Sequence, residues 1–163
     1  DGGVRIVGEG SLFLTGLSMQ SGGQITVEGE ANIITNGVVS GLQGKLGVSG
    51  AGELKLYVSE QIQLGIQDTI GSDDARKLAI FYSGTQDVEL GIQTNFKGVV
   101  YAPNATISPD PQGFIRGSLV GKRIVVDPQA FIYEDPNLGE WDAGMIGEGS
   151  GASVRDVLAW SQQ

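Results

Sequence analysis

Short apolar segments recur along the whole chain, and Gly, Pro, Asn or Asp separates almost every pair of them. Each segment is too short for a helix and is rich in β-branched and aromatic residues, which favours β-strands. In several segments, side chains would alternate between the two faces of a strand. Leu12 and Leu14, for example, would face one side while Phe13 faces the other. In the first fifty residues the predicted strands are Val4–Ile6, Leu12–Leu14, Ile25–Val27, Ile33–Thr35, Val38–Val39 and Leu46–Val48.

The stretch from Val88 to Tyr133 carries the strongest signal, because it repeats. Gly98–Val100 and Gly117–Val120 begin 19 positions apart, and each follows an apolar residue and then a basic one. A period near twenty residues is typical of a solenoid, in which one repeat forms one coil.

A second internal copy lies further upstream. Ile62–Gln67 matches Val88–Gln93 at an offset of 26, and both contain Leu-Gly-Ile-Gln. An alternating apolar strand precedes each copy, at Leu54–Val58 and at Leu78–Tyr82. The longer offset indicates an insertion in the loop Gly71–Lys77.

We predict an all-β fold: a single parallel β-solenoid, or β-helix, in which like residues of successive coils stack. The expected inward stacking pairs are Leu64 with Leu90, Ile66 with Ile92, and Phe96 with Phe114. An antiparallel β-sandwich of short strands is the alternative that irregular loop lengths leave open. Asn36-Gly37 between two strands also leaves open a local β-hairpin in place of a solenoid corner.

The predicted solenoid domain covers residues 1–136, and a Gly-rich extension follows at 137–163. The extension ends in Val154–Trp160, which fits either a strand or a short helix. In the charged loop Gly71–Lys77 we predict a single helical turn with Ser72 or Asp73 as its N-cap.

Composition supports this organisation and excludes several chemistries. Gly makes up 27 of the 163 residues, more than twice its usual share of roughly 7%, which disfavours long helices. His and Cys are both absent, so thiol nucleophiles, disulfides and the commonest general base are excluded.

The net charge of −9, with 10 Lys and Arg spread along the chain, would repel a nucleic-acid backbone or an anionic lipid surface. No apolar run is long enough for a membrane helix. We therefore expect no nucleic-acid partner and no direct membrane insertion of this chain.

Three segments together resemble a known family. They are Gly98–Ile107 (GVVYAPNATI), Gly117–Ile124 (GSLVGKRI) and Ala130–Asp135 (AFIYED). This pattern resembles the C-terminal domain of PilX-type, type IV pilus-associated bacterial surface proteins. Its repeat pattern is also similar to that of bactofilins, which are solenoids. The resemblance implies an extracytoplasmic β-solenoid at the bacterial cell surface, with a structural or adhesive role and with pilus or cell-surface proteins, or surface glycans, as partners.

The resemblance extends to Leu54–Val58, Leu78–Tyr82 and Val157–Trp160, and it departs from the family at one point. The His-Tyr that closes the family's last strand is Ile132-Tyr133 here, and the acidic pair after it is reversed to Glu134-Asp135. A ligand role for that His therefore has no counterpart in this chain.

Few residues are candidates for binding. Tyr101 and Asn104 lie in the Tyr-Ala-Pro-Asn-Ala segment, which is either a surface-binding loop or a plain coil corner. Tyr133 belongs to a possible exposed aromatic row that would suit glycan stacking; if the row faces inward, it is core. The members of that row are Tyr57, Phe81, Tyr82, Tyr101 and Tyr133.

Acidic residues give the remaining candidates. Asp73 and Asp74 are weak candidates for a Ca²⁺ site, because they lack the spacing of a calcium loop and are followed by Arg76 and Lys77. The second acidic patch consists of Glu134, Asp135, Glu140 and Asp142.

We predict no metal and no cofactor. We also predict no enzymatic activity, because the acidic patch has no basic partner at matching spacing. The predicted function is a non-enzymatic structural or adhesive module. Two alternatives stay open: a carbohydrate-binding or carbohydrate-active β-helix, and a scaffold that assembles end to end through uncapped coils.

Overall fold

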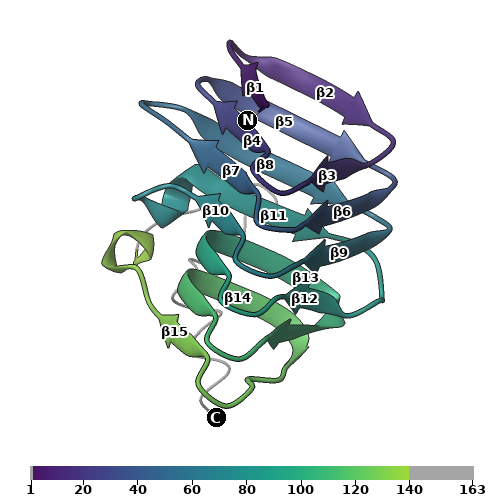
Figure 1. Cartoon of the computed structure of the whole chain (residues 1–163), viewed down its shortest axis with the longest axis vertical. Coiled ribbons are helices and arrows are strands. Elements are labelled where there is room, and N and C mark those ends of the chain that lie inside the picture. Colours follow the sequence, from purple (N-terminus) through teal and green to yellow (C-terminus); the bar gives the residue numbers. More distant parts are fainter. Residues whose placement is uncertain (1, 140–163) are drawn as a thin grey trace, which may run out of the picture.

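Every pair of hydrogen-bonded strands in residues 2–139, the part of the chain that the computed structural model describes, is parallel. The strands wind into a β-solenoid of about six turns (Figure 1). The predicted parallel solenoid is therefore confirmed, and the sandwich alternative is wrong.

Each turn of the solenoid, here called a coil, contributes one strand segment to each of three ladders. The first ladder contains β1 (Gly3–Ile6), β4 (Gln24–Val27), β7 (Lys45–Val48), β10 (Thr69–Gly71), the starts of β13 (Asn95–Pro109) and β14 (Phe114–Ile124), and β15 (Phe131–Tyr133). The second contains β2 (Gly10–Leu14), β5 (Glu30–Thr35), β8 (Glu53–Val58), β11 (Leu78–Tyr82) and the middles of β13 and β14. The third contains β3 (Leu17–Met19), β6 (Val38–Gly41), β9 (Gln61–Leu64), β12 (Val88–Leu90) and the ends of β13 and β14.

The core is a set of columns that run along the solenoid. In the second ladder the inward column contains Leu12, Ile33, Leu56, Ile80, Val100 and Leu119. All but Leu12, which belongs to the first coil, are buried. Period-two alternation turns the residue after each of these outward, so one strand supplies both the core and the surface.

The internal repeats identified in the sequence lie in register. Leu64 pairs with Leu90, and Gly98 pairs with Gly117. Close approach between coils requires glycine at Gly117, because a Cβ there would lie 1.8 Å from the Gly98 carbonyl oxygen. A Cβ on Gly91 would lie 2.4 Å from the Gly65 carbonyl oxygen in the same way.

Two of the predicted inward stacking pairs are wrong. Phe96 pairs with Ile115, whereas Phe114 lies one residue earlier, opposite Asn95 and outside the core. Ile66 and Ile92 are about half exposed because both lie at a corner after the third ladder, where the chain turns outward. Inward burial of the Leu64 and Leu90 pair is confirmed.

The local predictions were partly right. The strands at Leu17–Met19 and Thr69–Gly71 were missed. Asn36-Gly37 forms a corner and not a hairpin, because β5 and β6 pair with the coils above and below them. The loop before β11 does contain one helical turn, the 3-10 helix η1 (Ala75–Lys77), but its N-cap is Asp74.

A second 3-10 helix, η2 (Pro136–Leu138), follows β15 and spans the predicted domain boundary at 136/137. Residues 140–163, which include most of the predicted Gly-rich extension and the segment Val154–Trp160, lie outside the described residues. Within the described part, no helix has the length and apolarity that crossing a membrane requires.

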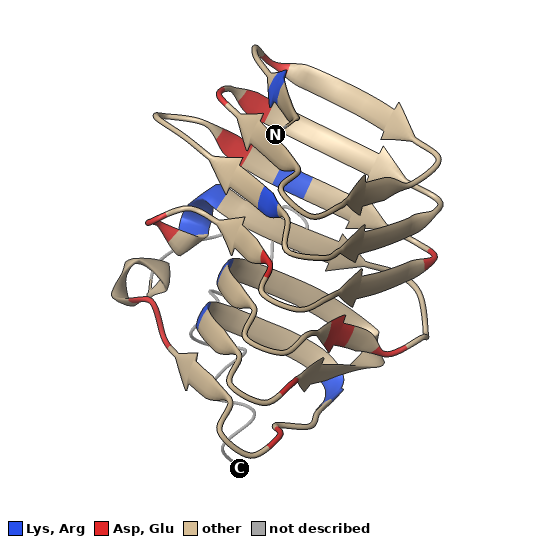
Figure 2. Cartoon of the chain, in the orientation of Figure 1, with Lys and Arg blue, Asp and Glu red and all other residues tan. Residues whose placement is uncertain are grey.

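Charged residues are spread over the corners and strands of the described part (Figure 2), and nearly all of their side chains are exposed or half-buried. Asp68 and Asp135 are the exceptions, since both are fully buried. The Asp68 carboxylate accepts hydrogen bonds from the backbone N–H groups of Gly44 (2.8 Å) and Gly65 (2.9 Å), so it closes a corner between two coils.

Candidate functional site

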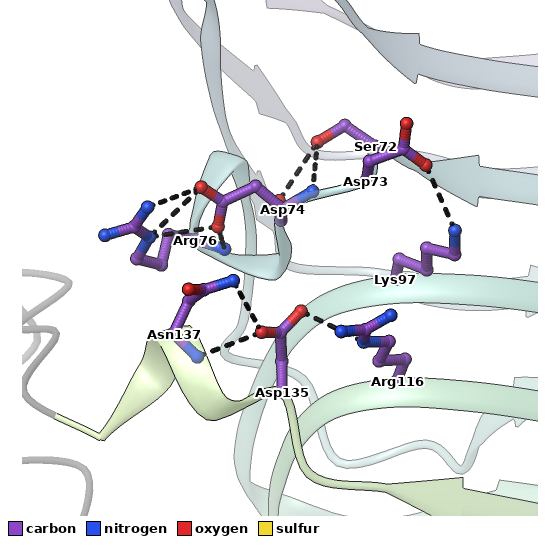
Figure 3. Close-up of polar contacts among 8 residues, drawn as sticks. All are labelled: Ser72, Asp73, Asp74, Arg76, Lys97, Arg116, Asp135 and Asn137. Carbon is purple, nitrogen blue, oxygen red and sulfur yellow. Dashed lines mark hydrogen bonds and ion pairs between the residues drawn. The ribbon is translucent and has the colours of Figure 1, made fainter.

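Two cations of adjacent coils lie side by side at the corner between the first and second ladders. Lys97 of β13 is in register with Arg116 of β14. Like charges at this spacing repel each other, so such a stack needs counter-charges from outside the ladder. Two short segments that leave the regular coils provide them (Figure 3).

The first segment is the insertion before β11. The Asp73 carboxylate lies 3.2 Å from the Lys97 ammonium, and the Asp73 side chain is fully exposed. Asp74 turns the other way: it accepts from the backbone N–H of Arg76 and forms a two-pronged pair with the Arg76 guanidinium, at 3.0 to 3.1 Å from Nε and 2.6 Å from Nη2. The hydrogen bond from Arg76 lowers the pKa of Asp74 below its ordinary value.

The second segment is the chain leaving β15. The buried Asp135 carboxylate lies 3.2 Å from Nε of Arg116 through one oxygen, where the geometry is that of an ion pair without a directed hydrogen bond. Its other oxygen accepts from the backbone N–H and the side-chain amide of Asn137, at 3.0 and 2.9 Å. Asp135 thereby caps η2 and fixes it to the sixth coil.

The two segments meet on an apolar contact. Ala75 of η1, Val99 of β13 and Leu138 of η2 form a small buried cluster outside the main core. This apolar contact and the polar pairs of Figure 3 together hold both segments on the solenoid.

The polar groups of this cluster are paired with one another. Each of the three carboxylates lies against a neighbouring base, and the Ser72 hydroxyl donates to the Asp74 carbonyl (Figure 3). Within residues 2–139, no group of three or more acidic side chains is arranged to hold a metal ion.

The sequence-predicted acidic candidates are therefore separated by the fold. Asp73 and Asp74 are neighbours in the chain but pair with different bases. Asp135 is buried while Glu134 is exposed, and Glu140 and Asp142 lie outside the described residues. The sequence indicated Asp135 as a candidate but gave no sign of its partner Arg116, because only the stacking of coils brings the two side chains together.

Tyr101, Asn104 and Tyr133 do not form one site. Tyr101 faces outward from the second ladder, between Phe81 and Val120. Asn104 is exposed at the corner where the register of β13 against β14 shifts. Tyr133 belongs to the first ladder, in register with Arg116.

The predicted aromatic row is divided in the same way. Tyr57, Phe81 and Tyr101 occupy one outward column, whereas Tyr82 is buried in the core and donates from its hydroxyl to the Glu60 carbonyl. Tyr57 and Phe81 stack with ring centroids 4.9 Å apart and planes inclined by 13°. Stacked rings cover each other's faces, so this column offers mainly ring edges to solvent.

A different aromatic group was missed at the C-terminal end of the first ladder. We call Phe114, Phe131 and Tyr133 the aromatic cluster; the three side chains are 38%, 51% and 48% exposed. The Tyr133 ring centroid lies 5.0 Å from that of Phe114 and 6.4 Å from that of Phe131. The signal was present in the sequence as two Phe residues 17 positions apart, which equals one coil here.

A third feature is a pair of acids at the corner after the third ladder. The motif Asp-Pro-Gln occurs twice, at 110–112 and 127–129, in successive coils. Burial raises the pKa of Asp110, and the nearby charges of Asp127 and Glu89 raise it further.

A model of the family described as "Domain of unknown function (DUF7305)" matches residues 1–140, and thus the whole described solenoid. No curated protein and no solved structure matches the chain.

Proposed function

We propose that this chain, which belongs to the DUF7305 family, is a non-enzymatic structural or adhesive module of a bacterial cell-surface or pilus-associated protein. In this role the solenoid acts as a stiff rod that keeps the residues of its outer faces at fixed positions. Partners of this module are other surface proteins.

The observation that carries the proposal is the continuity of the ladders. Columns of apolar residues fill the interior from the second coil to the sixth, and corner polar groups such as Asp68 are used to join coils. A stack of coils joined by parallel hydrogen-bonded ladders resists bending and local opening, because each inner coil is held by two neighbours.

The place at the cell surface rests on the resemblance of Gly98–Ile107, Gly117–Ile124 and Ala130–Asp135 to PilX-type proteins. Fractionation of the organism that encodes the chain tests it directly. We expect the native protein in the surface or secreted fraction, and recovery in the cytoplasm alone would refute this part of the proposal.

The non-enzymatic role is tested by incubating the purified chain with a panel of polysaccharides and glycosides. We expect no turnover. Turnover that disappears in Asp110→Asn or Asp127→Asn, at the corner where the two Asp-Pro-Gln motifs lie in successive coils, would overturn the proposal and assign hydrolysis to that corner.

The aromatic cluster favours carbohydrate binding as a second candidate function. Exposed rings suit stacking on sugar faces, and these three lie close enough to form one platform. Binding to a glycan array by the wild type, lost in Phe131→Ala and Tyr133→Ala but kept in Tyr57→Ala, would support it. Loss in all three variants, or binding in none, would exclude a site at this cluster.

A further inference from the structure

The outer face of the second ladder carries an unbroken apolar column. We define the outward column as Phe13, Ile34, Tyr57, Phe81, Tyr101 and Val120, one residue from each coil. Phe13 and Tyr57 are exposed and the other four are half-buried, and a continuous apolar patch on an outer face is typical of a contact surface.

The column beside it on the same face is already covered. Ala79, Val99 and Ser118 stand two residues before Phe81, Tyr101 and Val120 and are only 2%, 1% and 4% exposed. Two residues along a strand span about 7 Å, so the covered column and the outward column are immediate neighbours.

The chain itself begins this cover. Leu138 of η2 is buried against Val99 and Ala75, and the Asp135–Arg116 pair fixes η2 in that position. The described chain thus ends, at Gly139, beside the outward column and on the face that the column occupies.

We propose that the segment 140–163 packs along the outward column over Tyr57, Phe81 and Tyr101, as an intramolecular partner of the solenoid. The segment has 24 residues, and an extended chain of that length reaches about 80 Å, far more than the roughly 10 Å that separates these three coils. Its sequence contains large apolar residues suited to such a face, namely Trp141, Met145, Ile146, Leu158 and Trp160.

A consequence concerns the accessibility of the two aromatic surfaces. The segment would cover the outward column of the second ladder but leave the aromatic cluster of the first ladder free. The proposal does not depend on the proposed function, because it concerns a different face.

Trp141 and Trp160 are the only two tryptophans of the chain, so tryptophan fluorescence of the full chain reports on this segment alone. In the wild type we expect blue-shifted emission and weak quenching by acrylamide, both independent of protein concentration. Phe81→Glu, in the outward column, should shift the emission to the red and raise the quenching constant at least twofold. Phe131→Glu, an equally drastic change in the aromatic cluster, should leave both unchanged.

Three outcomes would overturn the proposal. Wild-type emission typical of free indole with full quenching would mean that the segment is not packed, whatever the variants do. An identical response to Phe81→Glu and Phe131→Glu, with circular dichroism confirming that both fold, would place the segment elsewhere. Emission that turns blue only as concentration rises would assign the contact to a second copy.

Removal of residues 140–163 gives an independent measurement. The shortened chain should keep the β-sheet circular dichroism of the full chain and bind more of the hydrophobic dye ANS. Unchanged dye binding by a folded truncation would contradict the cover.

Discussion

Five glutamines adopt the left-handed backbone conformation, which residues other than Gly rarely adopt. Gln43, Gln67, Gln93, Gln112 and Gln129 have φ between 54° and 67°, and each occupies the corner between the third and first ladders. The side-chain amides of the first three each donate to the side-chain oxygen of the glutamine in the next coil, at 3.0, 2.9 and 2.8 Å, so the ladder ends with Gln112 as an acceptor. The left-handed backbone costs roughly 1–2 kcal/mol at each position, and the amide ladder offsets part of it.

The central glutamine tests this balance through a matched pair of variants. Both Gln67→Ala and Gln67→Gly remove two amide hydrogen bonds, but only glycine relieves the left-handed backbone. We expect the glycine variant to be more stable than the alanine variant by about 1 kcal/mol in chemical denaturation. Equal stabilities would mean that the corner backbone is not strained.

At the scale of single elements, the loop before β11 and the segment after β15 are attached to Lys97 and Arg116 in different ways. Asp135 is buried and holds η2 through Arg116 and Asn137, whereas Asp73 meets Lys97 from a fully exposed position. Exposed ion pairs contribute little, while a buried carboxylate that loses its bonds leaves its partners unsatisfied.

We therefore expect Asp135→Ala to lower the free energy of opening of β15 and η2 by about 2 kcal/mol or more. Asp73→Ala, the control that removes the other acid of the same cluster, should leave the opening free energy unchanged. Hydrogen exchange at the backbone amides of Phe131–Tyr133 measures both, and comparable effects of the two variants would mean that burial does not decide the strength of these pairs.

The corner formed by the two Asp-Pro-Gln motifs makes stability depend on pH. The pKa of Asp110 is raised in the folded chain above its ordinary 3.8, so the folded state holds this proton more tightly than the unfolded state does. Its contribution to stability therefore falls as pH rises from about 3.8 through the raised pKa.

Asp110→Asn removes that charge while keeping the shape of the side chain. We expect a higher melting temperature than wild type at pH 7, and no difference at pH 3, where the carboxyl is protonated in both states. Melting curves of the two proteins at both pH values check this, and a lower melting temperature of the variant at pH 7 would contradict it.

At the scale of the whole molecule, stability depends on having a coil on both sides. Leu12 and Leu56 occupy the same inward column, but Leu12 is 42% exposed in the first coil and Leu56 is 1% exposed in the third. The same truncation thus creates a cavity at one position and only removes a surface contact at the other.

Leu56→Ala is expected to cost about 2–5 kcal/mol of unfolding free energy, and Leu12→Ala less than about 1 kcal/mol. Denaturant titration of the two variants against wild type provides the comparison. A similar cost at both positions would mean that the first coil is covered by a second copy in solution, which is the assembly alternative.

The sequence by itself determined that this chain forms short strands and that they repeat, because alternation and coil-length repetition are local properties of the chain. The repeats favoured parallel stacking, but only the tertiary structure excluded the antiparallel sandwich. Register was a different matter, because successive strands of the first ladder are spaced from 17 to 26 residues apart. A one-residue error moved Phe114 from the predicted core to the surface, since side chains alternate between the two faces of a strand. Only the tertiary structure brought Arg116 to Asp135 and joined the glutamines into a ladder, because both arrangements depend on which residues of neighbouring coils meet at a corner.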